Sequence, residues 1–450
     1  MSARFRITSA LWDRIHHFAS FPQTGVSLQQ MVLFGQNPSQ GTLLKASQFL
    51  CGQYLCLHTV YAVLSRACVE ELPVRLAHRV KELDELPHGL SDMTSINKVK
   101  NWYAQSFEEL ISFPPITVSS DIRAALVGSP DDDLHLPESI PNPSLEHLGE
   151  HYNTHGGHNS NGTGSNRLKL RIPMEKRYYA RTTDVEWPPE VHDYNKRFTR
   201  TLDAIKKRHD PTVTTVAQGV LEWKRSRNAR HIGLDIQAWL DRFYMSRIGI
   251  RFLIGQHVAL NTLQPHPDYV GIICTRANIH DIVHEAIENA RFVCEEHYAM
   301  FKGPPVQLIC PKDLHFAYVP GHLSHICFEL LKNSLRAVVE RYGRDNEDRL
   351  PPIKVIVVEG KEDITIKISD EGGGIPRSAI PLIWTYMYTT MEGQGIDQDF
   401  QASDFKAPMA GFGYGLPLSR LVFMALHLPP GSRLTALLNS TPVILEETCG

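Results

Sequence analysis

Four polar residues at helical spacing suggest where this chain carries out its chemistry. His325, Glu329, Asn333 and Arg336 recur every three or four positions within residues 322–340, so in a helix they share one face. The apolar residues between them would then face a core: Ile326, Leu330, Leu331, Leu335 and Val338. A carboxylate can act as a general base, a histidine one turn earlier can tune it, and an amide oxygen is a hard ligand suited to Mg²⁺.

Two glycine-rich segments follow this predicted helix. In SDEGGGIP, residues 369–376, Asp370 ends a predicted strand and can accept a hydrogen bond from the exocyclic amine of adenine. Gly372 and Gly374 would let the base lie against the backbone. The second segment, GFGYGLP, covers residues 411–417, and its closely spaced glycines leave backbone N–H groups free to bind phosphate.

Residues 378–410 lie between the two glycine segments, and their polar part from residue 385, TYMYTTMEGQGIDQDFQASDFKAPMA, is typical of a lid over a nucleotide. Within it, Thr389 and Thr390 are candidate phosphate contacts. Phosphoryl transfer depends on positioning and charge neutralisation, and these residue types supply both. The alternative for Glu329 and Asn333 is an ordinary solvated helix face. Both glycine segments, in this order after the helix, argue against that alternative.

Composition places the chain among globular proteins of more than one domain. It has 450 residues, of which 42% are hydrophobic and 21% charged, and a net charge of −3, which argues against an electrostatic nucleic-acid binder. The most apolar run, residues 50–64, is interrupted by Gly, Gln and His, so we expect no membrane insertion. Eight cysteines without a CxxC pair favour buried thiols in a reducing compartment.

Hydrophobic periodicity divides the chain into two parts. Helical patterns cover residues 11–35, as two short helices, and residues 43–49, 71–87, 96–113, 195–224 and 234–260, which predicts an N-terminal bundle of roughly four long helices. After residue 267, strand patterns alternate with helices at residues 279–298 and 322–340, as in an α+β domain. We therefore expect a helical domain over residues 11–264 and a second domain over 268–450. The polar, Gly- and Asn-rich insertion at residues 116–190 is expected to be disordered.

Several motifs resemble the mitochondrial pyruvate dehydrogenase kinase and branched-chain 2-oxoacid dehydrogenase kinase family, in a fungal-type member. The sequence matches that carry this resemblance are ELPVRLAHR, WYAQSFEEL, TVAQGVLEW, FYMSRIGIRFLIGQH, VGIICT, YVPGHLSHICFELLKNSLRA, ISDEGGGIP and GFGYGLPLSRL. The nucleotide motifs are similar, more broadly, to those of histidine kinases, gyrase-type topoisomerases and heat-shock chaperones. The resemblance spans residues 11–421, apart from the insertions.

The resemblance implies a protein serine/threonine kinase with a four-helix bundle followed by a histidine-kinase-like α/β sandwich. It implies Mg-ATP as cofactor, with Glu329 as catalytic base, His325 as its partner and Asn333 as the metal ligand. The implied ATP-binding residues are Glu329, Asn333, Arg336, Asp370, Gly372, Gly374, Thr389, Thr390, Gly411, Phe412, Gly413, Tyr414, Gly415 and Leu416.

The resemblance also implies partners and a location. The target would be a serine of the E1α subunit of a 2-oxoacid dehydrogenase complex, docking would use the lipoyl domain of E2, and the kinase would be a homodimer, or a heterodimer with a related kinase, in the mitochondrial matrix. We favour the pyruvate dehydrogenase complex, with the branched-chain complex as the alternative. No nucleic-acid partner is expected.

Two stretches depart from the family pattern. Residues 51–69 interrupt a helix pattern, and the sequence from residue 422 is atypical. Our hypothesis is that both derive from unspliced or mispredicted introns, the second of which shifts the reading frame; the alternative is a genuine divergent isoform. If the C-terminal stretch is genuine, the sheet is expected to lose strands beneath the nucleotide, which would leave a catalytically impaired binding protein.

Overall fold

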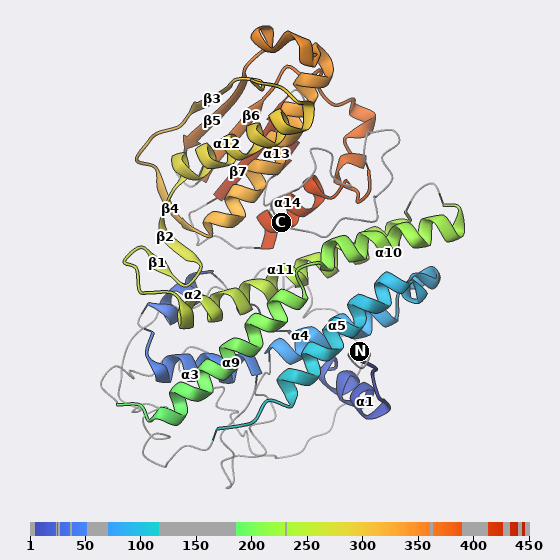
Figure 1. The fold of residues 1–450 in the computed structure, drawn as a ribbon, viewed down its shortest axis with the longest axis vertical. Coiled ribbons are helices and arrows are strands. Elements are labelled where there is room, and N and C mark those ends of the chain that lie inside the picture. The colour runs from blue at the N-terminus through green and yellow to red at the C-terminus, as the bar shows by residue number, and fades with distance from the viewer. Residues whose placement is uncertain are drawn as a thin grey trace, which may run out of the picture.

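The computed structural model places a helical domain beside an α/β domain (Figure 1). It describes residues 5–23, 25, 28–36, 38–51, 71–116, 186–229, 232–360, 363–388, 413–425, 433–439 and 443–445. Most of the two insertions recognised in the sequence, residues 51–69 and 116–190, lies outside these ranges, so the disorder predicted for residues 116–190 stays a prediction. Among the described helices, none is long and apolar enough to cross a membrane.

The helical domain is built mainly from long helices, as the hydrophobic periodicity predicted. In chain order its helices are α1 (Ser9–Phe18), α2 (Leu28–Gly35), α3 (Gln40–Cys51), α4 (Glu71–Asp84), α5 (Thr94–Ile111), α9 (Pro189–Arg208), α10 (Thr212–Arg227) and α11 (Leu234–Thr262), with a 3-10 segment, η3 (Pro87–Asp92), before α5. Contacts among α4, α5, α9, α10 and α11 define the bundle, and α1 and α3 pack on its side.

One helix prediction was wrong in its extent. The single helix expected over residues 195–224 is two helices, because α9 ends at Arg208 and α10 begins at Thr212. Pro211 lies at this break; it has no N–H to donate and disfavours helical geometry in the residue before it. The break leaves the His209 side chain buried beside α5, where its Nε2 lies 3.0 Å from Ser106 Oγ.

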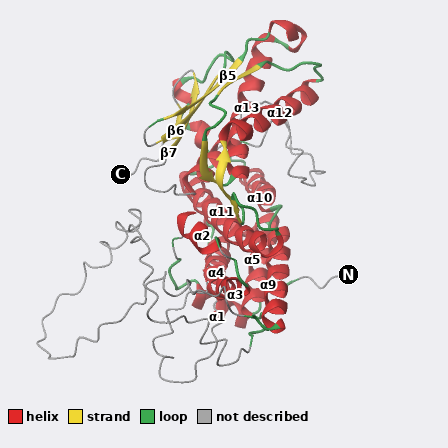
Figure 2. Ribbon diagram, turned by 90° about the vertical axis from the view of Figure 1, so that its left-hand side faces the viewer, coloured by secondary structure: helices red, strands yellow, loops and turns green. Residues whose placement is uncertain are grey.

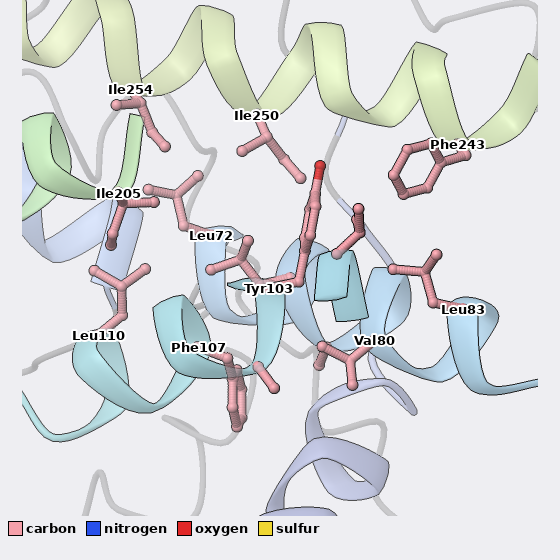
Figure 3. Close-up of a cluster of buried hydrophobic side chains, with 14 of the residues drawn as sticks. Leu72, Val80, Leu83, Tyr103, Phe107, Leu110, Ile205, Phe243, Ile250 and Ile254 are labelled. Atoms are coloured by element: carbon pink, nitrogen blue, oxygen red, sulfur yellow. The ribbon is translucent and has the colours of Figure 1, made fainter. Parts of the chain in front are cut away.

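The core of the bundle is a continuous cluster of aliphatic and aromatic side chains. Figure 3 shows side chains from four helices converging: Leu72, Val80 and Leu83 of α4, Tyr103, Phe107 and Leu110 of α5, Ile205 of α9, and Phe243, Ile250 and Ile254 of α11. Nearly all of these are completely buried. Tyr386, Tyr414 and Leu421, from the other domain, belong to the same cluster. The two domains therefore share part of one hydrophobic core.

Two buried histidines make the stability of the helical domain depend on pH. Burial lowers the pKa of His209 to about 3 and that of His257 to about 4. Both are neutral in the folded protein at neutral pH, whereas the unfolded chain protonates them near pH 6.5. The unfolded state therefore binds more protons below pH 6.5, and the free energy of unfolding falls with pH, by about 2 kcal/mol for each histidine at pH 5.

Replacing His257 with Leu removes one titrating group, at a site where its ring contacts Phe198. The free energy of unfolding is therefore expected to fall less between pH 7 and pH 5 than in the wild type. Urea unfolding followed by circular dichroism at pH 7 and pH 5 measures it. The exposed histidine variant His297→Leu, on another helix, serves as the control and should keep the full slope. Equal slopes for His257→Leu and the wild type would show that His257 does not titrate on unfolding.

The α/β domain contains a mixed sheet of five described strands in the order β3-β5-β6-β7-β8. These strands are β3 (Val306–Ile309), β5 (Ile353–Glu359), β6 (Asp363–Ser369), β7 (Arg433–Asn439) and β8 (Val443–Leu445). Alternation along β5 buries Ile353, Val355 and Val357 and turns Lys354 outward, as expected for a sheet with one covered face. A smaller antiparallel sheet, β1 (Tyr269–Val270), β2 (Ile273–Asn278) and β4 (His315–Tyr318), lies next to the helical domain.

Two long helices cover one face of the five-stranded sheet (Figure 2): α12 (Ile279–Tyr298) and α13 (Pro320–Tyr342). Short 3-10 segments follow: η4 (Arg344–Arg349), η5 (Arg377–Ala379) and η6 (Leu382–Trp384). A last helix, α14 (Gly415–Ala425), packs against α13 and α11. Pro320 starts α13 at the first-turn position that proline favours, and Gly343, at φ 84°, ends it.

The expectation that the sheet loses strands after residue 422 was wrong. Strand β7 pairs in parallel with β6 over its whole length, from Asp363 opposite Arg433 to Ser369 opposite Asn439, and β8 pairs with β7. The sequence after residue 422 therefore supplies two strands to the sheet, and the argument for an impaired site loses this support.

Candidate active site

Helix α13 carries the candidate general base in a buried position. The sequence predicted a helix over residues 322–340, and α13 runs from Pro320 to Tyr342 with its apolar stripe buried. Only 8% of Glu329 is exposed. Its Oε1 forms an ion pair with Lys332 Nζ at 2.8 Å, three residues on, and the Lys332 side chain is also buried. A solvated helix face, the alternative for Glu329, is thereby excluded.

The other Glu329 oxygen faces the start of α14. A side chain at Gly415 would have its Cβ in collision with Glu329 Oε2. Glycine is therefore the residue that lets the backbone at the start of α14 approach this carboxylate. With Oε1 held by Lys332 and Oε2 directed at Gly415, the carboxylate lies between α13 and the glycine loop.

The Asp370 carboxylate is fixed by two hydrogen bonds at the end of β6. Ser334 Oγ donates to Oδ2 at 3.0 Å, and the Gly372 backbone N–H donates to Oδ1 at 2.8 Å. Gly372 packs so tightly on α13 that a Cβ there would meet the Ala337 carbonyl carbon at 2.9 Å. Gly374 has φ 75°, a conformation that favours glycine. The carboxylate is held in one orientation, which is what recognition of a single ligand group needs.

The remaining predicted residues of α13 have different environments. The Asn333 amide is half-buried, and within the described part of the chain it has no hydrogen-bond partner. Arg336 Nε pairs with Glu340 at 2.6 Å. His325 is exposed. Neighbouring His322 has its pKa lowered to about 4, mainly by burial and also by the charge of His325. Glu329 forms its ion pair with Lys332. The predicted role of His325 as the partner of Glu329 therefore stays a prediction.

A residue near the start of the predicted lid lies beside one just past its end. The Met387 backbone N–H donates to the Gly413 carbonyl at 3.2 Å. Gly413 has φ 74°, and a Cβ there would approach the Tyr388 nitrogen to 2.7 Å. Tyr414 is buried and Leu416 half-buried. The other predicted phosphate contacts, Thr389, Thr390, Gly411 and Phe412, lie outside the described residues.

Sequence reasoning missed several residues that the fold brings to the site. Lys332 was detectable, since it follows Glu329 at the i,i+3 spacing that allows ion pairing. Ser334 was not, because its partner Asp370 is 36 residues away. Gln237 and Asp241 of α11 both accept hydrogen bonds from Tyr386, which lies 149 and 145 positions further along the chain. No local pattern signals contacts of that separation.

Comparisons with known proteins match both parts of the chain. A model of the mitochondrial branched-chain alpha-ketoacid dehydrogenase kinase domain matches residues 25–274, and a model of histidine kinase-, DNA gyrase B- and HSP90-like ATPases matches residues 318–436.

Among curated proteins, the mitochondrial [pyruvate dehydrogenase (acetyl-transferring)] kinase of Schizosaccharomyces pombe is 41% identical over 91% of this chain and 90% of its own length. The proteins of the same name from Arabidopsis thaliana and Drosophila melanogaster are 35% and 34% identical, over 92% and 91% of this chain and 87% and 82% of their own lengths.

Proposed function

Because the chain belongs to the family of mitochondrial [pyruvate dehydrogenase (acetyl-transferring)] kinases, we propose that it transfers the γ-phosphoryl group of Mg-ATP to a serine of the pyruvate dehydrogenase E1α subunit and so inactivates that enzyme. The observation that supports this most is the buried Glu329 carboxylate, held by Lys332 and directed at the glycine loop that begins α14. The fold supports ATP as the phosphoryl donor, since the second domain matches ATPase models.

Glu329 is the proposed general base. In this role its free oxygen accepts the proton of the serine hydroxyl as that oxygen attacks the γ-phosphorus. The Lys332 ammonium keeps the carboxylate from rotating, because it holds Oε1. Water has little access to this carboxylate, because Glu329 is almost fully buried. We propose His325 as a residue that tunes this base from the preceding turn.

Asn333 is the proposed Mg²⁺ ligand. Its half-buried amide has no partner among the described residues and lies one turn after Glu329. No group of three or more His, Cys, Asp or Glu side chains among the described residues has the arrangement of a metal site. This fits Mg²⁺, which needs few protein ligands when phosphate oxygens complete its shell. When bound, the ion would neutralise charge on the transferred phosphoryl group.

Asp370 is the proposed adenine ligand. Its two oxygens each accept one hydrogen bond within the protein, from Ser334 and Gly372, and each oxygen keeps a further lone pair for an exocyclic amine. The backbone of residues 411–416 is the proposed phosphate contact, with Thr389 and Thr390 from the lid. We also propose that Arg336 binds ATP, from the face of α13 that carries Glu329 and Asn333.

The proposed setting follows from the family. We propose that the chain acts in the mitochondrial matrix as a homodimer, or as a heterodimer with a related kinase, and docks on the lipoyl domain of E2. The relatives from S. pombe, A. thaliana and D. melanogaster are named as mitochondrial kinases of pyruvate dehydrogenase, which supports the organelle and the complex. We propose that residues 11–264 form the docking and regulatory domain and that residues 268–450 form the kinase domain.

One alternative substrate has specific support. The family model that matches residues 25–274 is described as a branched-chain alpha-ketoacid dehydrogenase kinase. The three relatives described above, each matched over nine tenths of this chain, are named for pyruvate dehydrogenase, so we favour that substrate.

Parallel phosphorylation assays test the proposal. Purified chain with labelled Mg-ATP is incubated with pyruvate dehydrogenase E1 and with branched-chain E1, each with its own E2. We expect label on the E1α subunit of pyruvate dehydrogenase and none with Glu329→Gln. Label only on branched-chain E1 would reassign the substrate. ATP binding without label on either E1 would contradict the kinase assignment and favour an impaired isoform.

A further inference from the structure

Helix α12 carries two histidines one turn apart near its start. The segment HDIVH runs from His280 to His284 within this helix. Residues four positions apart lie on one face of a helix, so the two imidazoles are neighbours. Two histidines at this spacing on a helix bind Zn²⁺ in metalloproteases, whose motif is H-E-x-x-H. The segment here has the same spacing, with an aspartate in place of the glutamate.

The two imidazole rings lie side by side. Their centroids are 6.1 Å apart, and their planes are inclined by 20°. A histidine nitrogen binds Zn²⁺ at about 2.0–2.1 Å, so two rings on one tetrahedral ion have centroids about 5 Å apart. The His280 side chain is 24% exposed, and His284 is exposed. A small rotation of the exposed His284 side chain therefore brings both rings to one ion at the protein surface.

Asp281 contacts His280 on the nitrogen that a metal does not need. Asp281 Oδ1 lies 3.1 Å from His280 Nδ1. A carboxylate at this nitrogen favours the tautomer that carries the proton there, which leaves the Nε2 lone pair for a metal. Histidines that bind metals almost always have such a partner on the other ring nitrogen, and the partner makes the ligand more basic. Asp281 thus has the position of an outer carboxylate of a metal site.

Carboxylates near the two histidines favour a cation. The positive end of the helix dipole lies at the start of α12 and opposes cation binding. Asp281 lies in the first turn and is exposed, as are Glu285 and Glu288. Each of these carboxylates is within four positions of His284, so each adjoins it on the helix. Together they offset the effect of the dipole.

The type and number of ligands determine which metals fit. The described residues contain no group of three or more His, Cys, Asp or Glu side chains arranged for a metal, so two histidines leave coordination positions to water. Imidazole ligands suit Zn²⁺, Cu²⁺ and Ni²⁺, whereas Mg²⁺ requires oxygen ligands. This pair is therefore chemically distinct from the magnesium site proposed at Asn333.

We propose that His280 and His284 form a surface site for a divalent transition metal such as Zn²⁺, with Asp281 as the outer carboxylate that orients His280. A bound ion joins two successive turns of α12 and stabilises the folded chain by mass action. The proposal goes beyond the kinase function and does not depend on it, because neither ATP nor a protein substrate takes part.

Titration calorimetry with Zn²⁺ on the full chain, in the presence of Mg²⁺, tests the proposal. The chain has 22 histidines, and three of them lie close together in sequence outside the described residues: His151, His155 and His158. These three are replaced with Gln in every protein compared, including the reference protein, so that they do not contribute to the measured binding.

We expect the reference protein to bind Zn²⁺, and each change at the pair to weaken that binding. Asp281→Asn should raise the Kd for Zn²⁺ by about 10-fold, since outer partners of metal ligands contribute about 10- to 100-fold. His280→Ala and His284→Ala remove a ligand itself, so each should raise the Kd by more than Asp281→Asn does. His297→Ala, at an exposed histidine further along α12, is the control and should keep the reference Kd.

Moving the second histidine tests the spacing. In the His280→Ala background, adding Glu288→His places two histidines four positions apart, at 284 and 288, and should recover part of the lost affinity. Adding Asn289→His instead places them five positions apart, on different faces, and should recover none. Both replaced side chains are exposed, so neither change disturbs the core.

Thermal melts with and without Zn²⁺ give a second measurement. Zn²⁺ should raise the midpoint of the reference protein and leave that of His284→Ala unchanged, while the two midpoints without Zn²⁺ agree. Reference affinity for Zn²⁺ in both His280→Ala and His284→Ala would overturn the proposal. Equal recovery by Glu288→His and Asn289→His would also overturn it, because binding would then not depend on the helical spacing.

Discussion

Glu329→Gln is expected to lower the rate of phosphoryl transfer by about 10²- to 10⁴-fold while ATP still binds. The substitution keeps the shape of the side chain and removes its ability to take a proton, and general-base catalysis contributes effects of that size. The measurement is label transfer to E1α at saturating Mg-ATP, with ATP affinity determined separately by calorimetry. The expected signature is a lower kcat with a Kd for ATP within a few-fold of the wild type.

The buried ion pair between Glu329 and Lys332 means that Glu329→Gln can also lower the stability of the fold. Gln at position 329 leaves the buried Lys332 ammonium without its anionic partner, which destabilises a fold. A second variant, Glu329→Gln with Lys332→Met, removes that unpaired charge and should be as inactive as the single variant. Glu296→Gln, at an exposed carboxylate of α12, is the control and should be active. Activity of the stable double variant above one tenth of the wild type would exclude Glu329 as the base.

Gly415→Ala is expected to weaken ATP binding and activity together, by about 10- to 100-fold. The new Cβ would overlap Glu329 Oε2, so either the glycine loop or the carboxylate must move. Overpacking of this kind costs about 1–3 kcal/mol. The loss should appear in both the Kd for ATP and the kcat, because one displacement disturbs the phosphate loop and the base.

Two variants separate this collision from a general effect of alanine. Gly321→Ala places a Cβ in open space in the first turn of α13 and should leave ATP affinity unchanged. In Glu329→Ala, the atoms that the new Cβ would meet are gone, so adding Gly415→Ala to that background should cost little further ATP affinity. An undiminished loss in the double variant would show that Gly415 acts through its backbone conformation rather than through its contact with Glu329.

Most helices, the strands β2, β3, β5 and β6, and the order of the motifs were predictable from the sequence. The α12 prediction over residues 279–298 matches its observed bounds, and α13 differs from prediction by two residues at each end. Apolar periodicity is a local signal, and these helices are long enough for the helical repeat to be recognised in the sequence. The antiparallel pairing of β5 and β6 was also predictable, since the two alternating runs are separated by a short turn.

Misjudged details depended on single residues or on distant parts of the chain. The break between α9 and α10 depends on a single residue, Pro211. It was missed because apolar residues continue at helical spacing on both sides of that proline. The strands after residue 422 were missed because resemblance to a family pattern ended there, whereas pairing with β6 depends on backbone hydrogen bonds that many sequences can form.

For the site, the sequence by itself determined which residues are candidates for the chemistry, and the tertiary structure decided how they are held. Glu329, Asn333, Asp370 and the glycine segments stand out because residue type and local spacing express a nucleotide site. The sequence did not reveal that Ser334 and Gly372 orient Asp370, or that Gly415 closes on Glu329. Nor did it show that Gln237 and Asp241 of α11 contact Tyr386 and Arg420 of the other domain. Apart from the hydrogen bond between Gly372 and Asp370, these contacts join residues tens to nearly two hundred positions apart, and only packing of the folded chain brings them together.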